Sequence, residues 1–341
     1  MSRIHPLVAA LILAALLPLS AGAEDASSGV TVTRDIEYAR VGEKRLLLDL
    51  YLPRADTPPP LVVWIHGGGW RMGSKDRVRL AWLADKGYAI ASINYRLSQE
   101  ATFPAQIHDC KGAVRWLRAN QERLGFNATN IGVAGSSAGG HLVALLGTSA
   151  GVAALEGEVG GNLEHSSRVQ AVVDYFGPTD FLEMARAKRG GKGAVTRLLG
   201  GTPQEVPEVA KLGSPATHVT ADDAPFFILH GTEDRLVPVG QSRLLDERLD
   251  AAGVPSDLRI LEGSGHGGKG FESRALKADL VAFLDKHVRG RAPVVTTPTE
   301  RQVKGIIQTL SSPGDTPIAS LENTVLHDEQ RDKDLAVRVT Y

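Results

Sequence analysis

Two serines stand side by side between glycines in residues 132–141, GVAGSSAGGH. Such a cluster alone is usually a loop, but one register of it spells G-x-S-x-G and places Ser137 at the centre, between Gly135 and Gly139. The motif directly follows the apolar run NIGVA and precedes the helix-compatible run GGHLVALLGTSA. A sharp strand-to-helix turn strains such a serine and projects its hydroxyl above the sheet, and small neighbours let the chain pass. We therefore predict that Ser137 is a nucleophile.

A serine hydroxyl is a poor nucleophile unless a base removes its proton. In hydrolases with this kind of serine turn, an acid and then a histidine follow the serine, each on a loop after a later strand. Asp234 follows the apolar run FFILH, and His266 follows LRIL. We predict that His266 takes the proton of Ser137 and that Asp234 holds the imidazole tautomer. Glu233 is the nearest rival acid, and the register favours Asp234.

Three successive glycines end the run of residues 64–70, WIHGGGW. Glycine amides can approach a ligand with no side chain in the way. The N–H groups of Gly68, Gly69 and Ala138 are predicted to form an oxyanion hole for the tetrahedral intermediate of acyl transfer. A tight turn is the alternative, but a turn seldom needs three glycines. Trp70 either borders the acyl pocket or packs into the core.

Strand and helix patterns alternate along the chain. Runs rich in valine and isoleucine predict strands that begin near Leu46, Leu61, Tyr88, Asn130, Val169, Phe226 and Leu258. Helix-period segments lie between them, including residues 104–125 and 240–253. This alternation implies an α/β fold with a mainly parallel sheet covered on both faces. Reactive groups then collect beyond the carboxyl ends of the strands.

From Asp35 to about Val288 the chain resembles the α/β-hydrolase superfamily. Within it, the chain resembles the HGGG-bearing esterases, which include the hormone-sensitive-lipase-like group and, more closely, the BD-FAE group of feruloyl and acetyl esterases. The similar pieces are HGGGW, INYRLS, DCKGAVRWLRAN, IGVAGSSAGGHLVALL, YFGPTDF, HGTEDRLVPVGQS and GSGHGG. The resemblance implies an α/β-hydrolase fold of about eight mostly parallel strands, with helices on both faces and a short cap insertion. It carries over Ser137, Asp234 and His266, and it implies no cofactor and no metal.

The resemblance implies a serine carboxylesterase that forms an acyl-enzyme at Ser137. The expected substrate is a small ester or a polysaccharide ester, such as an acetyl or feruloyl ester of a plant polysaccharide. An amide-cleaving, prolyl-peptidase-like enzyme shares the scaffold and the triad order and is an alternative. A non-catalytic ligand-binding homologue is another, because a fold does not fix a function.

Several further polar residues are expected to support the fold. His141 is expected on a helix that leads away from the site, and His230 is expected to pack. Asp109 and Arg96 occupy positions that in the resembling family support the fold through hydrogen bonds. Cys110 is the lone cysteine, so an internal disulfide is excluded, and no C-x-x-C or H-E-x-x-H pattern favours a metallohydrolase.

Residues 1–23 have the pattern of a secretory signal peptide. Arg3 precedes an apolar run over residues 7–17, and residues 21–23, Ala-Gly-Ala, form a cleavage site. An uncleaved membrane anchor is the competing interpretation, but the run is shorter than the roughly 20 residues that a spanning helix needs, and Pro18 interrupts it. We expect a secreted or periplasmic protein with no stable membrane insertion after cleavage.

Residues 24–290 are predicted to form the catalytic domain. Turn-rich sequence at about 177–223 breaks the strand–helix rhythm and predicts a cap insertion that affects substrate choice. A mobile surface insertion without a role is the alternative. A Pro/Thr-rich linker then leads into a tail over residues 291–341. The final KDLAVRVTY repeats the pattern of RLLLDLYLP, so the tail is either the start of a truncated second module or an edge strand or disordered tail.

Charge excludes some classes of partner. The formal net charge of the 341-residue chain is −1, and no basic run occurs. Nothing in this balance attracts a polyanion, so we expect no nucleic-acid partner. The sequence does not define an oligomeric state.

Overall fold

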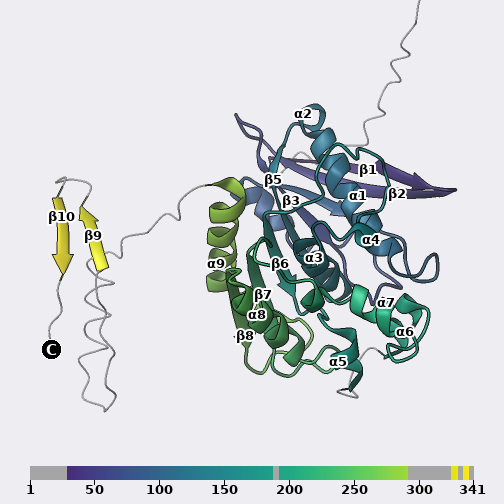
Figure 1. The fold of residues 1–341 in the computed structure, drawn as a ribbon. Helices are drawn as coiled ribbons and strands as arrows, with labels where there is room; N and C mark the ends of the chain where they lie inside the picture. Colours follow the sequence, from purple (N-terminus) through teal and green to yellow (C-terminus); the bar gives the residue numbers. More distant parts are fainter. Residues whose placement is uncertain (1–28, 187–191, 291–323, 329–332, 338–341) are drawn as a thin grey trace, which may run out of the picture. The chain divides into compact units, whose positions relative to one another are not determined.

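The structure is a computed structural model that describes residues 29–186 and 192–290 and two short strands near the C-terminus (Figure 1). The chain divides into two compact units, Met1–Gly290 and Arg291–Tyr341. In the second unit, β9 (Thr324–Asp328) pairs antiparallel with β10 (Lys333–Val337), so the final KDLAVRVTY does contain a strand. A second module stays a prediction. The signal peptide predicted for residues 1–23 lies outside the described residues.

An eight-stranded sheet forms the centre of the first unit, in the order β1-β2-β4-β3-β5-β6-β7-β8. The pairs β1–β2 and β2–β4 are antiparallel, and all other neighbours are parallel. The strands are β1 (Val30–Val41), β2 (Lys44–Pro53), β3 (Pro60–Ile65), β4 (Ala89–Ile93), β5 (Asn127–Ser136), β6 (Ala171–Tyr175), β7 (Phe226–Gly231) and β8 (Ser256–Leu261).

Helices cover both faces of this sheet (Figure 1). The longer ones are α1 (Ala105–Ala119), α3 (Ala138–Thr148), α8 (Gly240–Ala252) and α9 (Arg274–Leu284), which runs into η4 (Asp285–Arg289). Short helices are α2 (Gln121–Leu124), α4 (Ala153–Glu156), α5 (Phe181–Arg186), α6 (Lys192–Leu199) and α7 (Pro207–Leu212). Short 3₁₀ helices are η1 (Ala81–Lys86), η2 (Pro215–Thr217) and η3 (Lys269–Glu272).

Successive residues of β3 enter two different cores, because side chains of a strand point alternately to opposite faces. Leu61, Val63 and Ile65 pack in the core that contains residues of α1, α3 and α8. Val62 and Trp64 pack in the core that contains residues of α9 and η1. All five side chains are buried. The strand is therefore apolar throughout, as expected for a parallel strand with both faces covered.

The sheet order brings two loops together. Strand β3 lies between β4 and β5 in the sheet. The chain therefore passes from β3 to its neighbour β4 and then crosses to β5, the neighbour on the opposite edge of β3. The loops that follow β3 and β5 therefore begin side by side at the carboxyl edge of the sheet, which is where ligands bind in open α/β folds.

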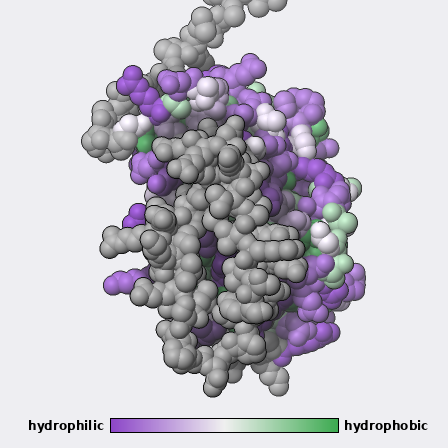
Figure 2. All heavy atoms as spheres, turned by 90° about the vertical axis from the view of Figure 1, so that its left-hand side faces the viewer, coloured by the Kyte–Doolittle hydropathy of each residue, from purple (hydrophilic) through white to green (hydrophobic). Residues whose placement is uncertain are grey.

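The described surface is mainly hydrophilic where Figure 2 displays it. Among the described residues, the exposed large hydrophobic side chains are Met72, Leu163 and Leu236. None of the described helices has both the length and the apolar character to cross a membrane.

The predicted fold class is confirmed, but the edge strand β1 was missing from the predicted strands. The side chains of β1 do not alternate regularly between the two faces of the sheet, because Asp35 has a φ of 57° and the register with β2 shifts twice. Most of its side chains are at least partly exposed, so they give no apolar run. The predicted cap insertion, about 177–223, holds the short helices α5, α6, α7 and η2 (Figure 1).

Candidate active site

Ser137 lies on a sharp turn between β5 and α3. Its backbone has φ 56° and ψ −118°, in a region that favours glycine, so a serine here is strained. The Ser137 N–H donates to the Tyr175 carbonyl (2.8 Å), and the Ser137 carbonyl accepts from the His141 N–H (2.9 Å). These two bonds attach the strained residue to the neighbouring strand β6 and to the first turn of α3.

The glycines around Ser137 are required by close backbone contacts. A Cβ atom on Gly139 would overlap the carbonyl oxygen of Ile65, and one on Gly135 would overlap the carbonyl of Gly139. A Cβ on Gly67 would lie 2.6 Å from the Ser136 carbonyl oxygen and 3.3 Å from the Ser137 Cβ. The glycine loop after β3 is therefore packed directly against the serine turn.

Asp234 and His266 form a hydrogen-bonded pair. His266 Nδ1 donates to Asp234 Oδ2 at 2.6 Å. Asp234 Oδ1 accepts from the backbone N–H groups of Leu236 (2.8 Å) and Val237 (2.9 Å), and its side chain is fully buried. His266 is 19% exposed, and its ring lies 4.5 Å from that of Phe176. The carboxylate fixes the ring with Nδ1 protonated, which leaves Nε2 free to accept a proton.

The structure separates Asp234 from its rival Glu233. Glu233 is exposed, whereas Asp234 contacts the histidine. Burial alone would raise the pKa of Asp234, but hydrogen bonds from His230, His266 and the Val237 amide outweigh burial and hold the pKa well below its usual range. Asp234 is therefore ionised throughout the neutral range.

His230 contacts the acid, which sequence reasoning missed. It is buried as expected, but its Nε2 lies 3.3 Å from Asp234 Oδ2 and 2.9 Å from the Val237 carbonyl oxygen. Ser242 Oγ lies 2.7 Å from its Nδ1. Because Nε2 faces acceptors, it carries the proton, and the Ser242 hydroxyl donates to Nδ1. His230 lies near the end of β7 and Asp234 lies in the loop that follows, so the sequence HGTED places the two near each other but does not show that they touch.

The predicted oxyanion donors follow β3 and begin α3. Gly68 and Gly69 have φ values of 117° and 60°. Within the described residues, neither of their amides donates a hydrogen bond. Ala138 is the first residue of α3, so its N–H has no acceptor one turn earlier in the helix. The loop that holds Gly68 and the start of α3 thus leave amides without partners beside Ser137.

A segment after β4 holds the glycine loop in place. Tyr95 Oη donates to the His66 carbonyl (3.0 Å), the Ser98 N–H donates to the Trp70 carbonyl (2.7 Å), and Gln99 Nε2 donates to the Arg71 carbonyl (3.0 Å). The motif INYRLS and the Gln99 that follows it therefore support the glycine loop.

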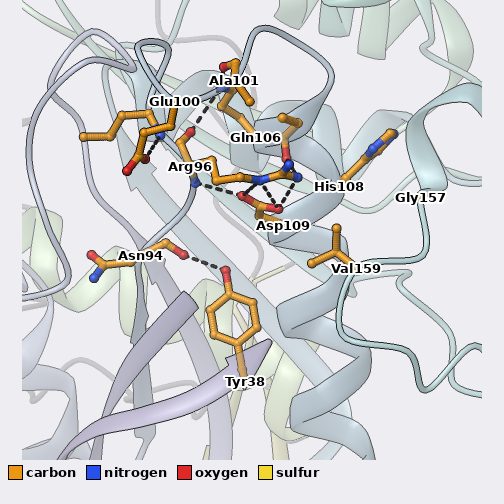
Figure 3. A network of polar contacts seen from close by, with 12 residues as sticks. Tyr38, Asn94, Arg96, Glu100, Ala101, Gln106, His108, Asp109, Gly157 and Val159 are labelled. Atoms are coloured by element: carbon orange, nitrogen blue, oxygen red, sulfur yellow. Dashed lines mark hydrogen bonds and ion pairs between the residues drawn. The ribbon is translucent and has the colours of Figure 1, made fainter. Parts of the chain in front are cut away.

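Arg96 in turn anchors that segment to α1 (Figure 3). Its Nη2 lies 2.6 Å from Asp109 Oδ1, its backbone N–H donates to Asp109 Oδ2 (2.8 Å), and Asp109 is fully buried. Gln106 Nε2 donates to the Arg96 carbonyl (3.1 Å). Arg96 and Asp109 thus have the supporting role expected from the sequence.

Ser137 and His266 line one cavity of about 560 Å³. Its apolar wall contains cap residues and residues that flank the acid, together with Trp70. The side chains concerned are Trp70, Phe176, Pro178, Met184, Ala194, Val195, Leu236 and Val237. The rest of the lining is formed by Arg71, Met72, Arg79 and Ser136 and by the glycines Gly67, Gly68, Gly69, Gly267 and Gly268. The cavity therefore combines the predicted nucleophile, the predicted base and two of the three predicted amide donors, Gly68 and Gly69, with an apolar surface.

The sheet, the strained serine turn and the acid–histidine pair define an α/β-hydrolase. A family model described as BD-FAE matches residues 48–249, which is more than half of the chain. The chain belongs to the BD-FAE family, as the sequence predicts.

Similar proteins include a truncated form of a carbohydrate esterase from gut microbiota, with a TM-score of 0.69 and 33% identity over 75% of this chain and 95% of that chain. Thermogutta terrifontis esterase 2, phosphoramylated by tabun, has a TM-score of 0.62 and 27% identity over 76% of this chain and 95% of that chain. Esterase LipC of Mycobacterium tuberculosis is 35% identical over 62% of this chain and 53% of its own length. The chain spans about half the length of the curated relatives it matches. These names agree with the predicted carboxylesterase class.

Proposed function

We propose that this protein is a serine esterase that hydrolyses carboxylic esters through an acyl-enzyme at Ser137. One observation carries the proposal: a strained serine lines the same cavity as a histidine whose Nδ1 is bonded to a buried carboxylate. A hydroxyl, an imidazole with a free Nε2 and a buried acid are the three groups that acyl transfer by serine requires.

In the proposed mechanism, His266 Nε2 takes the Ser137 proton as Oγ attacks the ester carbonyl carbon. The negative charge that develops on the carbonyl oxygen accepts hydrogen bonds from the amides of Gly68, Gly69 and Ala138. The C–O bond to the alcohol then breaks, and His266 gives the proton to the leaving alkoxide oxygen. A water molecule repeats these steps on the acyl-enzyme and releases the carboxylic acid. Asp234 stays ionised and stabilises the imidazolium.

The proposed substrate is an ester of a carbohydrate. A solved relative is named a carbohydrate esterase, and another is named an acetyl ester-xyloside bifunctional hydrolase. The cavity of about 560 Å³ suits a small acyl group against its apolar wall. Acetyl or feruloyl esters of plant polysaccharides are therefore the substrates to test. Release of residues 1–23 and export remain part of the proposal, and N-terminal sequencing of the mature protein tests them.

A fluorophosphonate probe tests the nucleophile, with the adjacent serine as the matched control. We expect the probe to label the protein and its Ser136→Ala variant but not its Ser137→Ala variant. Hydrolysis of 4-nitrophenyl acetate should follow the same pattern. Folded protein that neither reacts with the probe nor turns over the ester would favour the non-catalytic binding homologue. Faster cleavage of a prolyl anilide than of the acetate would favour the amide hydrolase.

A further inference from the structure

A second, larger cavity adjoins the catalytic one. Its volume is about 860 Å³, and it shares Gly67, Gly68, Met72, Arg79 and Ser136 with the catalytic cavity. Its remaining lining mixes polar and apolar residues: Trp64, His66, Gly73, Ser74, Arg77 and Val78. The two cavities together form a continuous site that extends well beyond the space for a small acyl group.

Arginine side chains give this site a positive charge. Arg71 and Arg79 line the catalytic cavity, Arg77 and Arg79 line the second one, and no aspartate or glutamate lines either. The formal net charge of the whole chain is only −1, so this bias is local. A concave site lined by one sign of charge raises the local concentration of a ligand of the opposite sign.

Two acids close to these arginines, in contact or in sequence, also have a lysine partner. Glu272 pairs with both Arg79 (2.9 Å) and Lys277 (3.2 Å). Asp76, beside Arg77 in sequence, pairs with Lys75 (3.3 Å) and accepts from the Ser74 hydroxyl. Glu272 is thus shared between two cations and offsets the charge of Arg79 only in part, while Asp76 is paired with Lys75.

Arg79 is held in place with its binding groups free. Its Nε bonds to Glu272, and its guanidinium lies 5.1 Å from the ring centre of Tyr175 and 5.6 Å from that of Phe271. Its two terminal nitrogens make no hydrogen bond within the described residues. A guanidinium that is already immobilised loses little further entropy when it binds a carboxylate through two parallel hydrogen bonds.

Ring contacts place Arg79 on the alcohol side of the site. The ring of Phe176 lies 4.5 Å from that of His266 and 5.1 Å from that of Phe271, which lies below Arg79. In the proposed mechanism His266 delivers its proton to the leaving alcohol, so the alcohol leaves on this side. The cap residues of the apolar wall, Met184 and Val195 among them, then remain for the acyl group.

We propose that the alcohol part of the substrate carries a carboxylate, as a uronic acid residue in an acylated polysaccharide does. Arg79 binds that carboxylate through its terminal nitrogens, and Arg77 and Arg71 attract the anionic chain to the site. This inference rests on the proposed esterase function for the assignment of the alcohol side.

Substrate preference tests the proposal. We expect a higher kcat/KM for acetylated polygalacturonate than for acetylated xylan, compared per acetyl group at low salt, and a preference that shrinks as salt rises. Arg79→Gln should lower the ratio of these two kcat/KM values by about tenfold to a hundredfold, because a charge-assisted pair is lost. Arg248→Gln, at an exposed arginine of α8 outside both cavities, should leave the ratio unchanged. Equal kcat/KM values for the two polymers, or an equal loss on both in Arg79→Gln, would overturn the proposal.

Binding measured without turnover separates this proposal from the esterase proposal. Calorimetry on the Ser137→Ala variant should detect trigalacturonate but not the neutral xylotriose, and adding Arg79→Gln should abolish the signal. If the wild-type protein hydrolyses no ester but binds trigalacturonate through Arg79, the esterase proposal fails and the anion site stands. If 4-nitrophenyl acetate is hydrolysed but trigalacturonate does not bind, the proposed carboxylate site is wrong and the esterase proposal stands.

Discussion

The indole Nε1 of Trp70 lies 3.3 Å from Nδ1 of His141. An indole nitrogen can only donate, so Nδ1 accepts and the proton of a neutral imidazole sits on Nε2. That Nε2 donates to the carbonyl of Gly213 at 2.6 Å. His141 thus joins the glycine loop, which ends at Trp70, to α3 and to the cap segment. Both bonds exist together only while the ring is neutral, because a proton on Nδ1 would face the indole N–H.

The buried His141 predicts a loss of stability in mild acid. Burial lowers the pKa of His141 from 6.5 to about 4, so between these pH values the unfolded chain binds a proton that the folded protein does not. The free energy of unfolding should therefore fall as pH drops from 6.5 toward 4, with a contribution of roughly 3 kcal/mol from this group. Urea unfolding at several pH values measures it.

The variant His141→Gln isolates the contribution of the imidazole. A glutamine can accept from Trp70 and donate to Gly213, but it does not titrate. The free energy of unfolding of the variant should therefore fall less steeply with decreasing pH, because unfolding takes up about one proton fewer between pH 6.5 and 4. His165→Gln, at a partly exposed histidine, is the control and should keep the wild-type slope. The same slope in His141→Gln as in the wild-type protein would contradict the assignment.

Two neighbouring acids give opposite expectations for turnover. Asp234→Asn keeps the size of the side chain but no longer holds His266 in the right tautomer, so kcat should fall by about four orders of magnitude. Glu233→Gln alters an exposed side chain and should change kcat less than twofold. Steady-state hydrolysis of 4-nitrophenyl acetate compares the two. Near-normal turnover in Asp234→Asn together with loss in Glu233→Gln would reverse the assignment of the acid.

Local patterns explain which features of the candidate site the sequence could predict. The turn at Ser137 needs glycine at fixed positions, because backbone from another strand approaches it closely, as the Ile65 carbonyl does at Gly139, so the spacing G-x-S-x-G predicts the turn. Two side-chain contacts could not be predicted in this way, His230 with Asp234 and Trp70 with His141. They depend on the direction in which each side chain points, and the spacing of residues in the sequence does not determine that direction. Strand β1 was missed for a related reason: it lies at the edge of the sheet, so burial imposes little pattern on it.

The glycine at position 139 sets two effects against each other. Alanine favours a helix over glycine by about 1 kcal/mol, and Gly139 lies in the first turn of α3. Its Cβ, however, would overlap the Ile65 carbonyl, and backbone cannot move aside as a side chain can. We expect Gly139→Ala to lower the free energy of unfolding by about 1–3 kcal/mol and to reduce kcat by displacing Ser137.

The control for this prediction is Gly240→Ala. Gly240 is the first residue of α8 and has open space where a Cβ would lie, so the variant should be as stable as the wild-type protein or slightly more so. Chemical unfolding of both variants compares their free energies of unfolding, and ester hydrolysis compares their kcat values. A Gly139→Ala protein with gained stability would show that helix propensity outweighs the overlap.

The pair of Arg96 and Asp109 predicts a large cost when only one partner is removed. Burial raises the pKa of Asp109 even though Arg96 opposes that shift, so the carboxylate depends on the guanidinium for its charge. Arg96→Gln should lower the free energy of unfolding by about 3–5 kcal/mol, because it leaves a buried acid without its partner. The double variant Arg96→Gln/Asp109→Asn should be less destabilised than the sum of the single variants.

An exposed pair of the same type provides the comparison. Arg40 and Glu37 are joined at 2.9 Å on the partly exposed strand β1, and Arg40→Gln should cost less than about 1 kcal/mol. Urea unfolding of the four variants at neutral pH measures both pairs. If Arg96→Gln costs no more than Arg40→Gln, the segment after β4 is not anchored by Arg96 but by other contacts, such as the bond from Gln106 to the Arg96 carbonyl.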